Sequence, residues 1–186
     1  VLKSTQSLQE IPLNHSSVHF YGRKAKNLLE ESRSLIADCL SLNPQELFFC
    51  SGATEAINTL IKGFIRKKTR IISSRIEHSC VYETMQFLEE KQFSVEYLPI
   101  VEGMVSLSAL ENALKIHQQE QVLVVLSSVN SETGAFLDLE KLAHLCQIYK
   151  ADLVISAVAN LGKVTLTLLE GITAACLSPN KFHGPK

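Results

Sequence analysis

The sequence lacks an excess of charge of either sign. It carries 18 lysines and arginines against 19 aspartates and glutamates, so no net field attracts nucleic acid or an anionic membrane. Long hydrophobic runs are also missing. The longest, residues 122–126, is far too short to span a bilayer, and the amino terminus shows no basic segment followed by an apolar one. We therefore expect neither nucleic acid nor a membrane as a partner.

The cysteines show no metal-binding or disulfide pattern. Their number is odd and CxxC spacing is absent: Cys39, Cys50, Cys80, Cys146 and Cys176. Three of them lie in apolar surroundings typical of core elements, which disfavours a disulfide framework or a zinc site. We expect no metal and a reducing compartment, with the cytoplasm as the first choice and an organelle as the alternative.

The length of 186 residues, with 46% hydrophobic composition, permits one sizeable core and is short for two full domains. Residues 1–22 are polar and irregular and predict an extended lead-in, before one domain over residues 23–186. The chain begins at Val1 and stops in the turn-like residues 184–186, so we expect a fragment of a longer protein.

Apolar periodicity predicts alternating helices and strands from Arg23 onward. The expected elements are helix 23–40, strand 47–50, helix 56–64, strand 70–73, helix 81–91, strand 94–98, a helix from Ser108 with a capping box completed by Glu111, strand 122–126, a helix capped by Asp138 and running through Tyr149, strand 152–155 and strand 172–177. The strands lack period-2 alternation and are separated by helices. This order predicts an α/β fold, a mostly parallel sheet with helices on both faces and ligand sites at the carboxyl ends of its strands.

Residues 51–55, Ser-Gly-Ala-Thr-Glu, lie between an expected strand and an expected helix. Free N–H groups and the positive end of the helix dipole would meet there, and the small residues let an anion approach closely. A tight turn in which Thr54 is an ordinary helix cap explains the same pattern equally well.

Lys181 follows the last expected strand, within residues 178–181, Ser-Pro-Asn-Lys. At the carboxyl edge of the sheet, a lysine can be partly desolvated, and the lowered amine pKa suits Schiff-base chemistry. By itself, a solvated surface charge is the commoner explanation.

Two further polar segments follow expected strands. His78 is placed where an imidazole can stack on an aromatic cofactor or move a proton, although helix capping or partial burial is the more frequent role. Residues 130–134, Asn-Ser-Glu-Thr-Gly, bring hydroxyls and an amide to the same edge. Neither segment identifies a function on its own.

Together and in this order, these segments resemble cysteine desulfurases of the class V aminotransferase group, which depend on pyridoxal phosphate. The resemblance runs from about His15 to Lys186 and is specific as a combination. The matching segments are residues 14–19, 22–25, 51–56, 76–78, 129–134, 161–163 and 178–186.

The resemblance implies the large domain of the type I fold of pyridoxal-phosphate-dependent transferases, in part, together with a set of site residues. Ala53, Thr54 and Ser178 would hold the cofactor phosphate, and Lys181 would attach the cofactor covalently. His78 would stack over the pyridine ring and take part in proton transfer. The catalytic residues would then be Lys181 and His78.

Four positions near the expected cofactor depart from the family pattern. Ser156 replaces the carboxylate that pairs with the pyridine nitrogen, and a hydroxyl supports only a neutral hydrogen bond there. Ala159 replaces a glutamine near the phenolic oxygen, Ser131 replaces an asparagine near that oxygen and the substrate, and Asn180 replaces the histidine before the lysine. We expect Ser131 and Ser156 still to face the cofactor, in a weaker electron sink.

Family chains are about twice as long as this one. The small domain with the nucleophilic cysteine and the substrate-clamping arginine is expected to be absent from this chain. None of the five cysteines matches that nucleophile, and only Cys80, two residues beyond His78, merits a test. The resemblance thus implies that the fragment alone is inactive.

The function implied by the resemblance is removal of sulfur from L-cysteine to give alanine and a protein persulfide, for sulfur transfer such as iron–sulfur cluster assembly. A homodimer and a sulfur-acceptor protein would be the partners. Two alternatives stay open: a non-catalytic paralogue that serves as a partner or regulatory subunit, favoured by Ser156 and Ala159, and another pyridoxal-phosphate-dependent lyase or transferase.

Overall fold

The structure is a computed structural model that describes residues 14–163 and 168–181. The described residues divide into two compact units, one formed by residues 14–49 and one by the described residues from 50 to 181. None of the described helices is both long and apolar enough to cross a membrane. Most of the expected lead-in (residues 1–13) and the chain end at 184–186 lie outside the described residues. The expected domain division at residue 22 stays a prediction.

The first unit contains one long helix, α2 (Phe20–Leu40), and the 3-10 helix η1 (Pro44–Glu46). The predicted amphipathic helix is therefore present, and it begins three residues before Arg23. Its start is set by His19, whose Nδ1 accepts a hydrogen bond from the Gly22 N–H at 3.3 Å. It ends at Ser41, which adopts the left-handed conformation with φ 55°.

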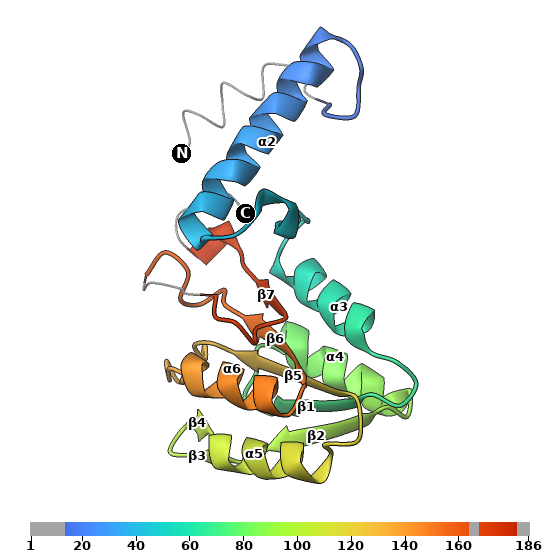
Figure 1. Cartoon of the computed structure of the whole chain (residues 1–186), viewed down its shortest axis with the longest axis vertical. Helices are drawn as coiled ribbons and strands as arrows, with labels where there is room; N and C mark the ends of the chain where they lie inside the picture. Colours follow the sequence, from blue (N-terminus) through green and yellow to red (C-terminus); the bar gives the residue numbers. More distant parts are fainter. Residues whose placement is uncertain (1–13, 164–167, 182–186) are drawn as a thin grey trace. The chain divides into compact units, whose positions relative to one another are not determined.

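The second unit holds the parallel sheet (Figure 1). Five strands in the order β2-β1-β5-β6-β7 all pair in parallel. The elements of this unit are α3 (Ala53–Phe64), β1 (Arg70–Ser74), α4 (Ser79–Glu90), β2 (Ser94–Leu98), β3 (Ile100–Val101), β4 (Met104–Val105), α5 (Leu107–Ile116), β5 (Val122–Ser127), α6 (Leu139–Ile148), β6 (Asp152–Ser156), β7 (Ala174–Cys176) and η2 (Pro179–Lys181). The predicted α/β fold with a mostly parallel sheet is confirmed.

Each face of the sheet is covered by its own pair of helices. Successive residues of a strand point to opposite faces, so the apolar strands bury side chains on both. In β5, Leu123 and Val125 pack with residues of α3 and α4, whereas Val124 and Leu126 pack with residues of α5 and α6. Figure 1 shows the same division, with α3 and α4 on one side and α5 and α6 on the other. This two-sided burial explains why the strands read as continuous apolar runs.

The strand expected over residues 47–50 is absent from the structure, and that prediction was wrong. Phe48 is 86% exposed and Phe49 46% exposed, so neither ring lies in a core. Instead, the carbonyl of Leu47 accepts a hydrogen bond from the Arg33 guanidinium, which also lies over the Phe49 ring at 4.9 Å. An apolar run becomes a strand only when another strand pairs with it, and none does so within the described residues.

The capping box predicted at Ser108 and Glu111 was also wrong. The helix α5 begins one residue earlier, and Ser106 caps it by accepting a hydrogen bond from the Ala109 N–H at 3.2 Å. Glu111 instead pairs with Lys115, one turn later, at 2.6 Å. The small antiparallel hairpin of β3 and β4 was not predicted, because each of its strands has only two residues.

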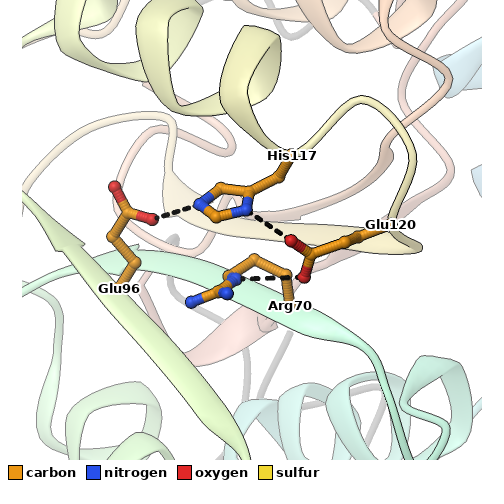
Figure 2. Close-up of polar contacts among 4 residues, drawn as sticks. All are labelled: Arg70, Glu96, His117 and Glu120. Atoms are coloured by element: carbon orange, nitrogen blue, oxygen red, sulfur yellow. Dashed lines mark hydrogen bonds and ion pairs between the residues drawn. The ribbon is translucent and has the colours of Figure 1, made fainter.

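Near the amino ends of β1 and β5, a polar cluster joins three elements (Figure 2). His117, which ends α5, contacts Glu120 through Nδ1 at 2.6 Å and Glu96 of β2 through Nε2 at 3.2 Å. Arg70 of β1 contacts the other Glu120 oxygen at 3.4 Å. Both histidine contacts are hydrogen bonds at the same time only when both ring nitrogens carry a proton.

We expect His117→Ala to reduce the pH dependence of stability in the acid range. The bond from His117, helped by Arg70, holds the pKa of Glu120 below its ordinary 4.5. A depressed carboxyl pKa stabilises the fold above the unfolded-state pKa, and this stability is lost as the pH falls through the folded-state value. Each exposed pair contributes below about 1 kcal/mol. Urea unfolding between pH 3 and pH 7 would measure the difference, with His144→Ala, an exposed histidine of α6, as the control. Equal pH profiles for wild type and His117→Ala would contradict this expectation.

Candidate functional site

The carboxyl ends of the parallel strands bring four of the predicted site residues to one edge of the sheet. His78 follows β1, Ser131 follows β5, Ser156 ends β6 and Ser178 follows β7. The register pairs Ser156 with Ser127 of β5 on one side and with Cys176 of β7 on the other. The topology therefore gathers segments that lie up to about one hundred residues apart in the sequence.

The turn before α3 has the features of an anion site. Gly52 is the residue before the first helical turn, and no side chain caps this end of α3 within the described residues. A methyl group built on Gly52 would meet no atom within 4 Å, so the space before the turn is open. Ser51 is engaged elsewhere, since its N–H and its hydroxyl both donate to Glu55 at 2.6 Å. The Ala53 and Thr54 end of the helix is thus available to an anion, and Thr54 is not the helix cap.

Residues 176–181 adjoin this turn. The thiol of Cys176, the last residue of β7, contacts the Ala53 carbonyl at 3.4 Å. Two residues later, the buried Ser178 donates from its hydroxyl to Asn180 Oδ1 at 2.8 Å. Lys181 is exposed and ends the short helix η2. The contact between β7 and α3 brings together the two segments that the resemblance assigns to phosphate binding and to cofactor attachment.

His78 caps α4. Its Nδ1 accepts a hydrogen bond from the Cys80 N–H at 3.3 Å and lies 3.1 Å from the Cys80 sulfur. The side chain is exposed. His78 therefore has the helix-capping role named above. The cap uses Nδ1, so Nε2 is left for another partner.

The loop that carries Ser131 is organised by Asn130. The side-chain oxygen of Asn130 accepts hydrogen bonds from the N–H groups of Glu132 and Thr133, both at 2.9 Å. Its amide nitrogen donates to the Ile76 carbonyl at 2.6 Å, in the turn before His78. Ser131 is exposed, and its hydroxyl contacts Glu132 at 3.3 Å. Asn130 thus connects the two loops, a role that the sequence pattern did not reveal.

Ser156 lies buried at the end of β6, 9% exposed. Its carbonyl accepts hydrogen bonds from the Ser128 N–H at 3.0 Å and from the Ser128 hydroxyl at 3.3 Å. The same hydroxyl lies 2.9 Å from the side-chain oxygen of Asn160. Ser156 and its neighbours Ser128 and Asn160 are neutral, so no charged side chain stands at position 156, where the resemblance led us to expect a carboxylate.

Glu77 is the functional candidate that sequence reasoning missed. It is 8% exposed, and it accepts hydrogen bonds from Ser74 at 2.9 Å and from Ser127. Burial raises the pKa of this carboxyl, while the bonds from the two hydroxyls lower it in part. Its position next to His78 was the available signal, since a carboxylate directly after a buried strand is rarely left without partners.

One pocket borders the turn of Glu77. Its lining is mostly apolar and includes Met104, Val105, Phe136 and Leu137. Glu77 and Asn130 contribute polar atoms, whereas Thr54, Ser178 and Lys181 do not line this pocket. The pocket therefore lies beside the turn that carries His78 and is not lined by the residues predicted to bind the phosphate and attach the cofactor.

Two cysteines near the edge, Cys80 and Cys176, are not activated as nucleophiles. Burial raises the pKa of Cys80, and burial raises the pKa of Cys176 to about 12. Such thiols stay protonated at neutral pH, whereas the reactive form of a cysteine is the thiolate. Within the described part of the chain, no group of three or more His, Cys, Asp or Glu side chains is arranged to hold a metal ion.

Comparison with known proteins identifies the family. The family described as "Aminotransferase class-V" matches residues 2–186. The chain is 36% identical over 177 residues to the cysteine desulfurase IscS of Vibrio vulnificus, covering 92% of this chain and 43% of that protein. It is 35% identical over 178 residues to the mitochondrial cysteine desulfurase of Candida albicans, covering 92% of this chain and 36% of that protein.

Solved structures agree with this result. A NifS-like protein superposes with a TM-score of 0.84 at 34% identity, over 93% of this chain and 49% of that chain. A structure described as SspA in complex with cysteine gives a TM-score of 0.88 at 30% identity, over 100% of this chain and 55% of that chain. The chain spans about half or less of the length of these relatives. Since the family match covers nearly every residue, the chain belongs to the class V aminotransferase family, in which the relatives compared here are cysteine desulfurases and NifS-like proteins.

Proposed function

We propose that this chain is the cofactor-binding part of a pyridoxal-phosphate-dependent cysteine desulfurase. The observation that carries the proposal is the contact between the Cys176 thiol and the Ala53 carbonyl at 3.4 Å. It joins the uncapped end of α3 to the segment that leads to Ser178 and Lys181. A phosphate-binding site and an attachment amine are the two features by which a protein holds this cofactor.

The phosphate half of the cofactor fits the residues present. The N–H groups of Ala53 and Thr54 would donate to an anion in the open space at Gly52, and the dipole of the twelve-residue helix α3 favours negative charge there. Ser178, near the end of β7, would add a hydroxyl. These groups would bind the phosphate of the cofactor, and its ring would lie near the carboxyl ends of the strands.

The ring half fits less well than in the family pattern. Bound pyridoxal phosphate supplies an electron-withdrawing ring that stabilises negative charge beside the substrate amine. Ser156 offers the ring nitrogen a hydroxyl, which does not hold a proton on that nitrogen as a carboxylate does. We expect the chain to bind the cofactor. The bound ring should withdraw electrons less strongly than it does in the relatives.

Two side chains of this chain would handle protons. The amine of Lys181 would attach the cofactor and, once displaced by the substrate amine, would move a proton. His78 would assist through Nε2, since its Nδ1 is engaged by the Cys80 N–H. Ser131, on the loop held by Asn130, would face the ring and the substrate.

The substrate in this proposal is L-cysteine, and the products are alanine and a persulfide. The sulfur would pass to a thiolate outside this chain. Two cysteines of the chain, Cys80 and Cys176, have raised pKa values that disfavour this role. A second copy of the protein would complete the site, a sulfur-acceptor protein would receive the sulfur, and a reducing compartment, cytoplasmic or organellar, would keep the thiols reduced.

The proposal is tested by titrating the purified protein with pyridoxal 5′-phosphate and recording visible absorbance. A saturable band is expected. Pyridoxal, which lacks the phosphate, is the matched probe and should bind about 10- to 100-fold more weakly, because charge-assisted hydrogen bonds contribute about 1.5–3 kcal/mol. Equal affinities would contradict the anion site at α3, and the lack of any band would contradict cofactor binding.

A second measurement separates desulfuration from the alternatives. The loaded protein is supplied with small amino acids, and alanine, pyruvate and sulfide are assayed. Sulfide with alanine from L-cysteine, in the presence of a thiol acceptor, supports the desulfurase. Cofactor binding without turnover would favour the non-catalytic paralogue suggested by Ser156, and pyruvate would favour a different lyase reaction.

A further inference from the structure

The turn between β1 and α4, residues 75–78, is tied to two strand ends by one buried side chain. Glu77 accepts through Oε1 from the hydroxyl of Ser74, the last residue of β1, at 2.9 Å. Through Oε2 it accepts from the hydroxyl of Ser127, the last residue of β5. The two carboxyl oxygens therefore link the turn that carries His78 to the ends of two neighbouring strands.

A second contact holds the same turn. Asn130 donates from its amide nitrogen to the Ile76 carbonyl at 2.6 Å, while its oxygen accepts the N–H groups of Glu132 and Thr133 at 2.9 Å. Glu77 and Asn130 are both buried, with exposed fractions of 8%. Hydrogen bonds at such depth are costly to break, because the groups left behind lose water as well as their partners.

The held turn ends at His78, whose Nδ1 receives the Cys80 N–H at 3.3 Å. This bond fixes the ring against the first turn of α4 only while the backbone at residues 76–78 keeps its place. A shift of the turn would break this bond. The imidazole would then be free to turn, and the Cys80 N–H at the start of α4 would lose its acceptor. Positioning of the imidazole thus depends on contacts made by the residue before it.

We propose that Glu77 is a positioning residue that clamps the 75–78 turn to the ends of β1 and β5 and so fixes the orientation of His78. The relevance of this clamp to the reaction rests on the proposed function, whereas the clamp itself is a property of the chain without cofactor. Glu77 acts through His78 and is not assigned a contact with cofactor or substrate.

The clamp consists of hydroxyl–carboxyl hydrogen bonds. Burial raises the pKa of Glu77, and the bonds from Ser127 and Ser74 oppose this effect. A side chain of the same shape with a neutral donor and acceptor can make both contacts, since serine hydroxyls both donate and accept. Glutamine should therefore replace Glu77 in this role, and alanine should not.

The test compares Glu77→Gln, Glu77→Ala and Ser127→Ala in the protein without cofactor. Hydrogen exchange of the Cys80 amide is measured together with the imidazole resonance of His78, which is assigned by its loss in His78→Gln. In Glu77→Ala, we expect about tenfold faster exchange and a broadened or split His78 resonance. Ser127→Ala should give a smaller change in the same direction, and Glu77→Gln should resemble the wild type.

Met85→Ala is the matched control. Met85 is a fully buried residue of the same helix α4, so its truncation lowers global stability without touching the turn. It should leave the His78 resonance sharp. A change as large in Met85→Ala as in Glu77→Ala, or an unchanged His78 in both Glu77→Ala and Ser127→Ala, would overturn the proposal. If Glu77→Ala fails to fold, Ser127→Ala alone decides.

A cofactor titration then connects the clamp to the site. With pyridoxal 5′-phosphate, Glu77→Ala should show an altered absorbance band, Glu77→Gln should restore the wild-type band, and Met85→Ala should keep it. Absence of binding in the wild type would count against the proposed function and leave the clamp supported by the measurements without cofactor. Normal binding in the wild type with an unaltered band in Glu77→Ala would count against the role of the clamp.

Discussion

Lys181→Ala is expected to abolish the visible absorbance band that pyridoxal 5′-phosphate gives with the protein, and with it all desulfuration. The imine linkage to the cofactor aldehyde, which borohydride would trap, requires a primary amine, and alanine offers none. Residual binding through the phosphate should persist, because the end of α3 at Ala53 and Thr54 is unchanged. The measurements are absorbance during titration, and borohydride reduction followed by mass spectrometry of the labelled peptide.

Lys141→Ala is the control for this variant. Lys141 is exposed in the first turns of α6 and belongs to the same unit as Lys181. It should keep the band and the label. A label on Lys181 in the wild type and no label in Lys181→Ala supports the assignment. A band of wild-type strength in Lys181→Ala would show that another amine, or no amine, attaches the cofactor.

Gly171→Ala is expected to lower the free energy of unfolding strongly. Gly171 has φ +97°, and an added Cβ would lie 2.6 Å from the Ala143 carbonyl oxygen of α6. The backbone conformation disfavours an L side chain, and the clash is with backbone that cannot rotate away. Together these effects amount to about 2–5 kcal/mol. Thermal unfolding should show a Tm lower by about 4–20 °C.

Gly134→Ala separates the two causes of this effect. Gly134 also has a positive φ, +71°, but a Cβ built there meets nothing within 4 Å. Its expected loss is the conformational part alone, about 1–2 kcal/mol. Equal losses in the two variants would mean that the contact between Gly171 and α6 contributes nothing. Gly171 lies in the turn before β7, so the larger effect should also weaken the binding of cofactor.

The prediction of strands from apolar runs succeeded wherever the run was buried on both faces. The runs at 122–126 and 152–155 contain side chains suited to either face, and helices cover both. The run at 47–50 is also apolar and forms no strand. Phe48 and Phe49 stay exposed, and the Leu47 carbonyl accepts a hydrogen bond from Arg33. The apolar composition of a segment shows that it can be buried. Whether it is buried depends on the strands and helices that pack against it.

Helix caps show a similar limit. Asp138 was predicted to begin α6 and does so, with its carboxylate accepting the Lys141 N–H at 3.0 Å. Around α5, two serines lie two residues apart, and Ser108 was the one predicted as the cap. The actual cap is Ser106, since its hydroxyl reaches the Ala109 N–H while Ser108 already lies inside the helix. Which serine caps the helix depends on where the preceding strand, β4, ends.

The sequence by itself determined the class of fold, the family and the polar segments that follow the strands, because apolar periodicity and motif order are local properties of the chain. The tertiary structure alone decided which of these segments meet. It joined β7 to the start of α3 through Cys176 and Ala53, and it placed Glu77 between Ser74 and Ser127. These contacts span up to 123 residues, and their partners are set by the order of strands in the sheet, which no local pattern encodes.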